Sequence, residues 1–157
     1  MYTTRKLKKW NVLSFLKVAS ILYRCGKFMA KEYDLHHWDN SRLKTAAIVA
    51  VCAMKNDVYL VYEEKEVVAT FQLRKKDEDT LLFQKLATFP QLTKKGVGSF
   101  CINEIEKIGK TENCQEVVCE VYDKSDNAKN FYFHRGYEQY GIVETRKYTE
   151  LKLKKKI

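Results

Sequence analysis

The segment Gln91-Leu-Thr-Lys-Lys-Gly-Val-Gly-Ser99 places two lysines and two glycines directly before a predicted helix. Residues 80–88 predict the strand that leads into it, and apolar residues at helical spacing predict a helix over residues 96–110. The first turn of a helix leaves backbone N–H groups without partners, and the helix dipole adds partial positive charge there. Glycine lets the backbone approach a ligand closely. The segment therefore predicts a phosphate-binding turn.

The hydrophobic pattern on either side of this turn predicts a mixed α/β chain. Period-two and apolar runs predict strands over residues 2–7, 58–62, 67–73, 80–88, 117–121, 137–143 and 145–153. Helical spacing predicts helices over residues 12–25, 41–54, 96–110 and 127–135. Gly26 and Gly136 are expected to end the first and last of these helices, and Ser41 is expected to begin the second. An aromatic-rich loop is expected over residues 28–40, and a solvated tail over residues 152–157.

Length and composition predict one domain, residues 1–157. The chain is 45% hydrophobic, which is enough for a sizeable core without disulfide or metal staples. It has one proline and six glycines, with no linker-like or repeated segment that would divide it.

The distribution of charged residues and cysteines predicts a cytoplasmic protein that does not span a membrane. Lysines and arginines interrupt the first thirty residues, and no window approaches the roughly 20 apolar residues of a membrane-spanning helix. Five cysteines form an odd set without metal-ligand spacing. Reduced thiols and no bound metal are therefore expected.

A formal net charge of +9 favours polyanionic partners, among them nucleic acid, anionic membranes and phosphorylated cofactors. The lysines are spread from Lys6 to Lys156, without the basic segment interleaved with aromatic residues that a nucleic-acid binder needs. No nucleic-acid partner is expected. The acidic run at residues 63–66 and the basic run at residues 152–156 are interpreted as solvated surface.

The spacing of the glycines excludes two common nucleotide motifs. The chain lacks the Gly-x-x-x-x-Gly-Lys-Ser/Thr sequence of a P-loop. Cys101 occupies the place of the third glycine in the dinucleotide fingerprint Gly-x-Gly-x-x-Gly.

Two blocks resemble the GNAT superfamily of N-acetyltransferases. Leu86-Ala-Thr-Phe-Pro-Gln-Leu-Thr-Lys-Lys-Gly-Val-Gly98 is similar to its acetyl-CoA signature, Gln/Arg-x-x-Gly-x-Gly/Ala. Val121-Tyr-Asp-Lys-Ser-Asp-Asn-Ala-Lys-Asn-Phe-Tyr-Phe-His-Arg-Gly-Tyr137 resembles its later Ala-x-x-Leu/Phe-Tyr motif. The resemblance covers roughly residues 58–140. It implies a mostly antiparallel sheet of six or seven strands, flanked by about four helices, with a central βαβ unit.

The resemblance also implies acetyl-CoA as the acyl donor. The sequence departs from the family pattern at three positions, where Thr93, Lys94 and Ser125 replace Gln/Arg, Gly and Asn. Backbone N–H groups are therefore expected to supply most phosphate contacts. The predicted cofactor-binding residues are Leu86, Ala87, Thr88, Thr93, Lys94, Lys95, Gly96, Val97, Gly98, Ser99, Ser125, Asn127 and Tyr132.

Amine acylation needs a proton donor for the leaving thiolate, an oxyanion stabiliser and a base. By resemblance, Tyr132 is the general acid, and backbone N–H groups at Leu86 and Thr88 are candidates for the oxyanion. Glu120 is the candidate base, with the histidines of the aromatic loop as alternatives. His36, His37 and Trp38 are candidate substrate contacts; the alternative is that this loop packs beneath the first two helices.

The sequence therefore predicts an enzyme that moves an acetyl group from acetyl-CoA to a primary amine of a small molecule or peptide by direct attack. The alternative is an inactive acyl-CoA-binding module with a regulatory role. Cys101 and Cys119 are interpreted as buried packing residues rather than nucleophiles. Homodimers are common in the resembled family, so a homodimer is a possible assembly.

Overall fold

The computed structural model describes residues 1–8, 11–36, 42–92 and 95–157. The sheet has seven strands in the order β1-β2-β3-β4-β5-β7-β6, which confirms the predicted mixed α/β fold. The strands are β1 (Tyr2–Lys6), β2 (Asp57–Glu63), β3 (Glu66–Lys75), β4 (Thr80–Thr88), β5 (Glu116–Tyr122), β6 (Glu138–Glu144) and β7 (Thr149–Lys156). The helices are α1 (Val12–Tyr33), α2 (Arg42–Lys55), α3 (Val97–Thr111) and α4 (Asp126–Phe133), with a 3₁₀ turn η1 at Pro90–Leu92.

Contacts group the chain into two compact units, the first made of residues 1–74 and 85–105, and the second of residues 75–84 and 106–157. The expectation of a single domain stays a prediction. None of the helices in the described residues is long and apolar enough to cross a membrane.

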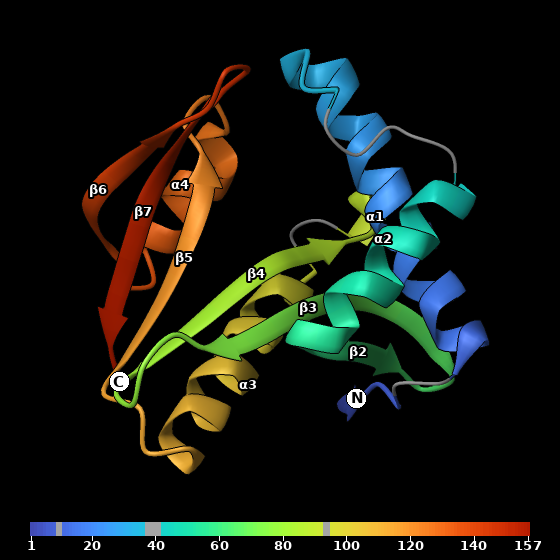
Figure 1. Ribbon diagram of the computed structural model, residues 1–157, viewed down its shortest axis with the longest axis horizontal. Coiled ribbons are helices and arrows are strands. Elements are labelled where there is room, and N and C mark those ends of the chain that lie inside the picture. The colour runs from blue at the N-terminus through green and yellow to red at the C-terminus, as the bar shows by residue number, and fades with distance from the viewer. Residues whose placement is uncertain (9–10, 37–41, 93–94) are drawn as a thin grey trace. The chain divides into compact units, whose positions relative to one another are not determined.

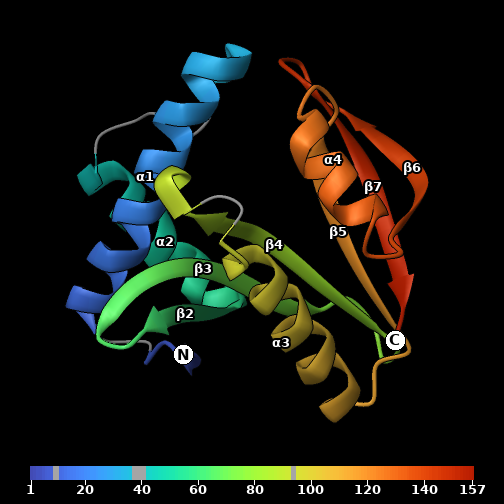
Figure 2. The same cartoon turned by 180° about the vertical axis from the view of Figure 1, so that it is seen from behind.

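In the first unit, β2 pairs antiparallel with both β1 and β3. Alternation along these strands sends Val58 and Leu60 into a core with α1 and α2, while Tyr59 and Phe71 stack on the opposite face with centroids 5.0 Å apart. Helices α1 and α2 lie on one side of β2 and β3 (Figure 1), and the first part of α3 lies on the other (Figure 2).

Helix α1 extends beyond its predicted end at Gly26. Gly26 is buried within the helix, which runs to Tyr33 and is capped by Asp34 in the left-handed region with φ 54°. Burial of Val18, Ile21 and Leu22 against the sheet outweighs the roughly 1 kcal/mol that an internal glycine costs. The predicted loop over residues 28–40 is therefore helical up to Tyr33. Ser41 lies outside the described residues.

In the second unit, β7 lies between β5 and β6 and is antiparallel to both. The expected solvated tail is wrong, because residues 152–156 belong to β7 and pair with β5. Leu153 is fully buried opposite Cys119, and strand alternation lets the neighbouring lysines reach water along their aliphatic stems. Residues 145–148 form a turn, in which the Thr145 hydroxyl donates to the carbonyl of Tyr148 at 2.7 Å.

Strand β4 is the first strand of the predicted βαβ unit, and it leads into the turn. It pairs in parallel with β5 over three residue pairs, and this register ends at Leu82 and Val118. Lys85, within the strand, has a φ of 52°. A side chain in the left-handed region is uncommon and marks an interruption of the regular strand.

Candidate functional site

The glycine turn is built between η1 and α3. The N–H of Leu92 donates to the carbonyl of Phe89 at 2.8 Å, and the N–H of Lys95 donates to the carbonyl of Leu92 at 3.3 Å. Gly96 follows with a φ of 82°, which favours glycine. A Cβ atom at Gly96 would meet no protein atom within 4 Å, so the space beside it is open. Thr93 and Lys94 lie outside the described residues.

Helix α3 begins immediately after Gly96, as the sequence predicts to within one residue. Val97 is 2% exposed, and the next turns bury Cys101, Ile102 and Ile105 completely, so the start of the helix is anchored in the core. The N–H groups of Val97, Gly98 and Ser99 belong to the first helical turn, where no intrahelical acceptor exists. Together with exposed Lys95, this arrangement fits the oxygens of a phosphate group.

Strand β1 supports the turn from a distant part of the sequence. The hydroxyl of Tyr2 donates to the carbonyl of Lys95 at 3.1 Å, and the ring of Tyr2 packs against Phe100 with centroids 5.4 Å apart. Nothing in the local sequence around residues 91–99 indicated this support, because it depends on long-range strand pairing.

The end of β4 is held by α1. The Cys25 thiol donates to the carbonyl of Thr88 at 2.9 Å, and burial raises the pKa of that thiol to about 12. Ala87 packs against the core beneath α1 and α2. Strand alternation places Leu86 and Thr88 toward the opposite face from Ala87. Their assignment to the oxyanion and the pantetheine arm stays a prediction.

Tyr132 is set in an aromatic cluster in the second unit. It lies on α4, is 8% exposed, and its ring centroid lies 5.9 Å from that of Phe83 and 5.6 Å from that of Tyr137. The backbone carbonyl of Tyr132 accepts from the N–H of Tyr137 at 3.1 Å. The cluster gives the phenol a defined position, although the sequence alone did not distinguish a catalytic tyrosine from a packing one.

Ser125 and Asn127 stand at the start of α4. Ser125 is 5% exposed and occupies the N-cap position, yet its side chain makes no capping hydrogen bond. Asn127 is exposed in the first turn of the helix. Both residues therefore lie at the same end of α4, while their contacts with a cofactor stay predictions.

The predicted base, Glu120, lies on the opposite face of β5 from the aromatic cluster. It is exposed and pairs in register with Lys152, whereas Cys119 beside it is buried on the face of Tyr137. A second carboxyl group, Glu150 on β7, was missed by the sequence reasoning. Burial and the charge of Glu120 raise the pKa of Glu150, which places two carboxyl groups on this face.

Tyr137 contacts a partly buried ion pair that the sequence did not indicate. Its hydroxyl donates to Glu106 Oε1 at 3.4 Å, and Lys155 Nζ forms an ion pair with the same oxygen at 2.8 Å. Burial, together with the charge of Glu106, raises the pKa of Tyr137 far above its usual value. The phenol of Tyr137 therefore stays neutral and serves as a hydrogen-bond donor.

Of the predicted substrate residues, the structure describes only His36. Its Nε2 lies 3.0 Å from Asp34 Oδ1, and its side chain is 61% exposed just beyond the end of α1. His37 and Trp38 lie outside the described residues. A role for these residues in binding an acceptor stays a prediction.

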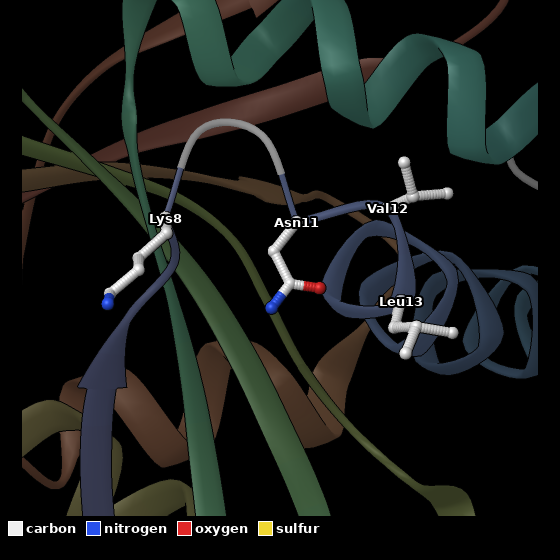
Figure 3. Close-up of a pocket in the computed structure, with 4 residues that line it drawn as sticks. All are labelled: Lys8, Asn11, Val12 and Leu13. Atoms are coloured by element: carbon white, nitrogen blue, oxygen red, sulfur yellow. The ribbon is translucent and has the colours of Figure 1, made fainter.

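A shallow hollow lies where β1 passes to α1, and it involves none of the predicted site residues. Lys8, Asn11, Val12 and Leu13 line it (Figure 3). The Asn11 side chain already caps α1 by accepting from the N–H of Ser14 at 3.1 Å. The hollow therefore contributes nothing to the candidate site.

The chain is similar to one known protein family. The model of the acetyltransferase (GNAT) family matches residues 17–137. No curated protein matches the sequence significantly.

Three solved structures illustrate the likeness of fold. An acetyltransferase from Streptococcus agalactiae is 15% identical with a TM-score of 0.77, covering 99% of this chain and 98% of its own. A GNAT acetyltransferase from Elizabethkingia anophelis with acetyl-CoA bound is 10% identical, covering 99% and 98%, with a TM-score of 0.73. The PaiA N-acetyltransferase from Thermoplasma acidophilum in complex with coenzyme A is 17% identical, covering 100% and 99%, with a TM-score of 0.73. With the family model spanning most of its length, this chain belongs to the GNAT family of acetyltransferases.

Proposed function

We propose that this protein transfers an acetyl group from acetyl-CoA to a primary amine of a small molecule or peptide. The observation that carries the proposal is the Gly96 turn, which opens into the anchored N-terminus of α3. Two proteins of similar fold hold acetyl-CoA or coenzyme A, which supports the choice of donor.

The donor would be held mainly by the backbone. N–H groups at Val97, Gly98 and Ser99 would donate hydrogen bonds to the pyrophosphate oxygens, with Lys95 adding positive charge at the rim. Thr93 and Lys94 complete the proposed turn in the sequence. Leu86, Ala87 and Thr88 at the end of β4, and Ser125 and Asn127 at the start of α4, are proposed contacts for the pantetheine arm.

Tyr132 is proposed as the general acid. The acceptor nitrogen attacks the thioester carbonyl, the C–S bond breaks, and the Tyr132 hydroxyl gives its proton to the leaving sulfur. The packing of its ring against Phe83 and Tyr137 supports this role, because an ordered ring directs its hydroxyl consistently. The phenolate would be reprotonated from solvent.

The carboxyl groups on the other face of β5 are proposed to take the proton from the acceptor amine. Glu120 is the first candidate, and Glu150 is a second because its raised pKa makes it a stronger base than an ordinary carboxylate. The attacking nitrogen and the leaving sulfur share one carbon atom, so a base on the face opposite the Tyr132 ring would take the amine proton through ordered water. The histidines before α2 remain alternative bases in this proposal.

Calorimetric titration of the protein with acetyl-CoA tests the donor assignment. Binding at tens of micromolar or tighter is expected, and its absence would contradict the proposal. Release of free thiol in the presence of a panel of primary amines then tests catalysis. Binding without thiol release for any amine would assign the chain to the alternative function, an acyl-CoA-binding module.

A further inference from the structure

A polar cluster lies under α2, on the face of the sheet that carries no part of the proposed phosphate turn. It consists of Cys52 on α2, Gln72 on β3 and Lys85 on β4, all in the first unit. Figure 1 shows α2 lying over β3. Lys85 stands at the interruption of β4, where its φ is 52°.

The lysine contacts both other members of the cluster. Its Nζ donates to Cys52 Sγ at 3.1 Å and lies 3.4 Å from Gln72 Oε1. Sulfur and nitrogen are therefore in van der Waals contact, at the separation from which one nucleophile can hand an acyl group to the other. Cys52 is half-buried, so the residue is partly open to solution.

Gln72 adds an unused donor to the same place. Its side chain is fully buried, and its Nε2 has no hydrogen-bond partner among the described residues. A buried amide donor without an acceptor is unfavourable, because it has lost its hydrogen bonds to water. The cluster therefore lacks one acceptor, such as a carbonyl oxygen, close to Lys85.

The other four cysteines are poorly suited to act as nucleophiles. Burial raises the thiol pKa of Cys25, Cys101, Cys114 and Cys119, which disfavours their reactive thiolate forms. For Cys101 and Cys119 this agrees with the packing role expected from the sequence. Cys52 is the cysteine whose sulfur accepts a hydrogen bond from a lysine.

We propose that Cys52 and Lys85 form a self-acetylation site, at which Cys52 takes an acetyl group from acetyl-CoA and passes it to Lys85. This modification rests on the proposed function only for the identity of the donor, and it is separate from turnover of an acceptor amine.

The two steps balance without an oxidant. In the first, Cys52 Sγ attacks the thioester carbonyl, the C–S bond to CoA breaks, and the thiol proton leaves with CoA as its free thiol. In the second, Lys85 Nζ, after losing one proton to water, attacks the Cys52 thioester. The new C–S bond breaks, an amide forms, and a second proton from the nitrogen restores the Cys52 thiol.

The product suits its surroundings better than the unmodified lysine. The acetyl carbonyl on Lys85 supplies the acceptor that Gln72 Nε2 lacks. Acetylation also removes a positive charge from a half-buried side chain. Both changes favour the modified state.

Mass spectrometry of the whole protein after incubation with isotope-labelled acetyl-CoA tests the proposal. The wild type is expected to carry label on Lys85 as an amide, which resists hydroxylamine. In Lys85→Arg, label is expected to remain on Cys52 as a thioester, which hydroxylamine removes. In Cys52→Ser and Cys52→Ala, labelling of Lys85 is expected to fall about tenfold or more, because the intramolecular donor is lost.

Matched controls are available within the chain. Exposed Lys65 in the β2–β3 turn reports direct chemical acetylation and is expected to be labelled equally in all variants. Cys25→Ser removes a thiol whose hydrogen bond goes to the carbonyl of Thr88 and keeps a donor for that carbonyl, so Lys85 labelling is expected to stay at the wild-type level. Circular dichroism checks that each variant is folded.

Equal labelling of Lys85 in the wild type and in both Cys52 variants would overturn the relay. So would absence of label from Cys52 in Lys85→Arg. The same experiment with the thioester S-acetyl-N-acetylcysteamine at high concentration does not require a CoA site. Failure of acetyl-CoA binding by calorimetry would thus reject the proposed function, whereas a failure with the small thioester would reject the relay itself.

Discussion

The ring of Tyr132 packs against the ring of Tyr137, with centroids 5.6 Å apart and planes inclined at 63°. Tyr137 is in turn held by Glu106, which also binds Lys155. The proposed acid is therefore supported by a chain of contacts that reaches α3 and β7. Such support orients a reacting group without touching the reactants.

Replacement of Tyr132 by phenylalanine tests the proposed acid. The ring and its packing stay, so the affinity for acetyl-CoA measured by calorimetry is expected to remain near wild type. The turnover number is expected to fall about a hundredfold or more, because the proton donor is lost. Turnover equal to wild type, measured by thiol release, would remove Tyr132 from the mechanism.

Substitutions at Tyr137 separate its hydroxyl from its ring. Tyr137→Phe removes one hydrogen bond to Glu106 and is expected to lower the free energy of unfolding by about 1 kcal/mol. Tyr137→Ala also removes a 2% exposed ring and is expected to cost about 3–5 kcal/mol. Denaturant unfolding measures both. If Tyr137 orients Tyr132, turnover falls in the alanine variant and is retained in the phenylalanine variant; equal turnover in folded samples of both would contradict that role.

Gly96 and Gly136 form a matched pair for testing the turn. Their φ angles are 82° and 81°, so alanine at either position is expected to destabilise the fold by about 1–2 kcal/mol through backbone strain. Only at Gly96 does the added methyl group enter the open space assigned to the phosphates. Acetyl-CoA affinity is therefore expected to fall at least about tenfold in Gly96→Ala and to stay unchanged in Gly136→Ala. Equal affinities in the two variants would place the phosphates elsewhere.

Glu150 makes stability depend on pH in a predictable direction. Its pKa is raised in the folded state, so the folded protein binds more protons than the unfolded chain as the pH rises through its usual value of 4.5. Stability contributed by this group is present below that pH and is lost as the pH increases through the raised pKa. Glu150→Gln is expected to stabilise the protein at pH 7 by less than about 1 kcal/mol, since water screens the half-exposed carboxylate.

Thermal unfolding of the wild type and Glu150→Gln across the acidic and neutral range measures this effect. The difference in Tm is expected to shrink toward zero below pH 4.5, where the carboxyl group is protonated in both states. Glu138→Gln, on an exposed residue of β6, provides a control for the loss of one negative charge. A Glu150 variant no more stable than this control at pH 7 would show that burial does not penalise its charge.

Local patterns in the sequence were enough to predict the helices and strands that surround the turn. The alternation around Val58 and the helical spacing of Val97, Cys101 and Ile105 each depend on residues close together in the chain. The glycine pair and the second motif then indicated the family, and the family model confirms it. The positive φ of Gly96 follows the same local logic.

Features that depend on partners distant in the sequence were missed or wrong. Gly26 does not end its helix, because burial of α1 against the sheet outweighs a local helix-breaking preference. The lysine-rich segment after Thr149 is a paired strand rather than a tail, because its backbone completes hydrogen bonds to β5. No local pattern marks Glu106 and Lys155 as the support of Tyr137.

The sequence by itself determined the fold class, the family and the position of the proposed phosphate turn, since these follow from short-range periodicity and motif spacing. Tertiary structure alone brought Cys52 within 3.1 Å of Lys85 and set Tyr137 between Tyr132 and Glu106. The contact of Cys52 with Lys85 joins residues 33 positions apart, and that of Tyr137 with Glu106 joins residues 31 positions apart. Their geometry is decided by strand register and helix packing, which no stretch of local sequence encodes.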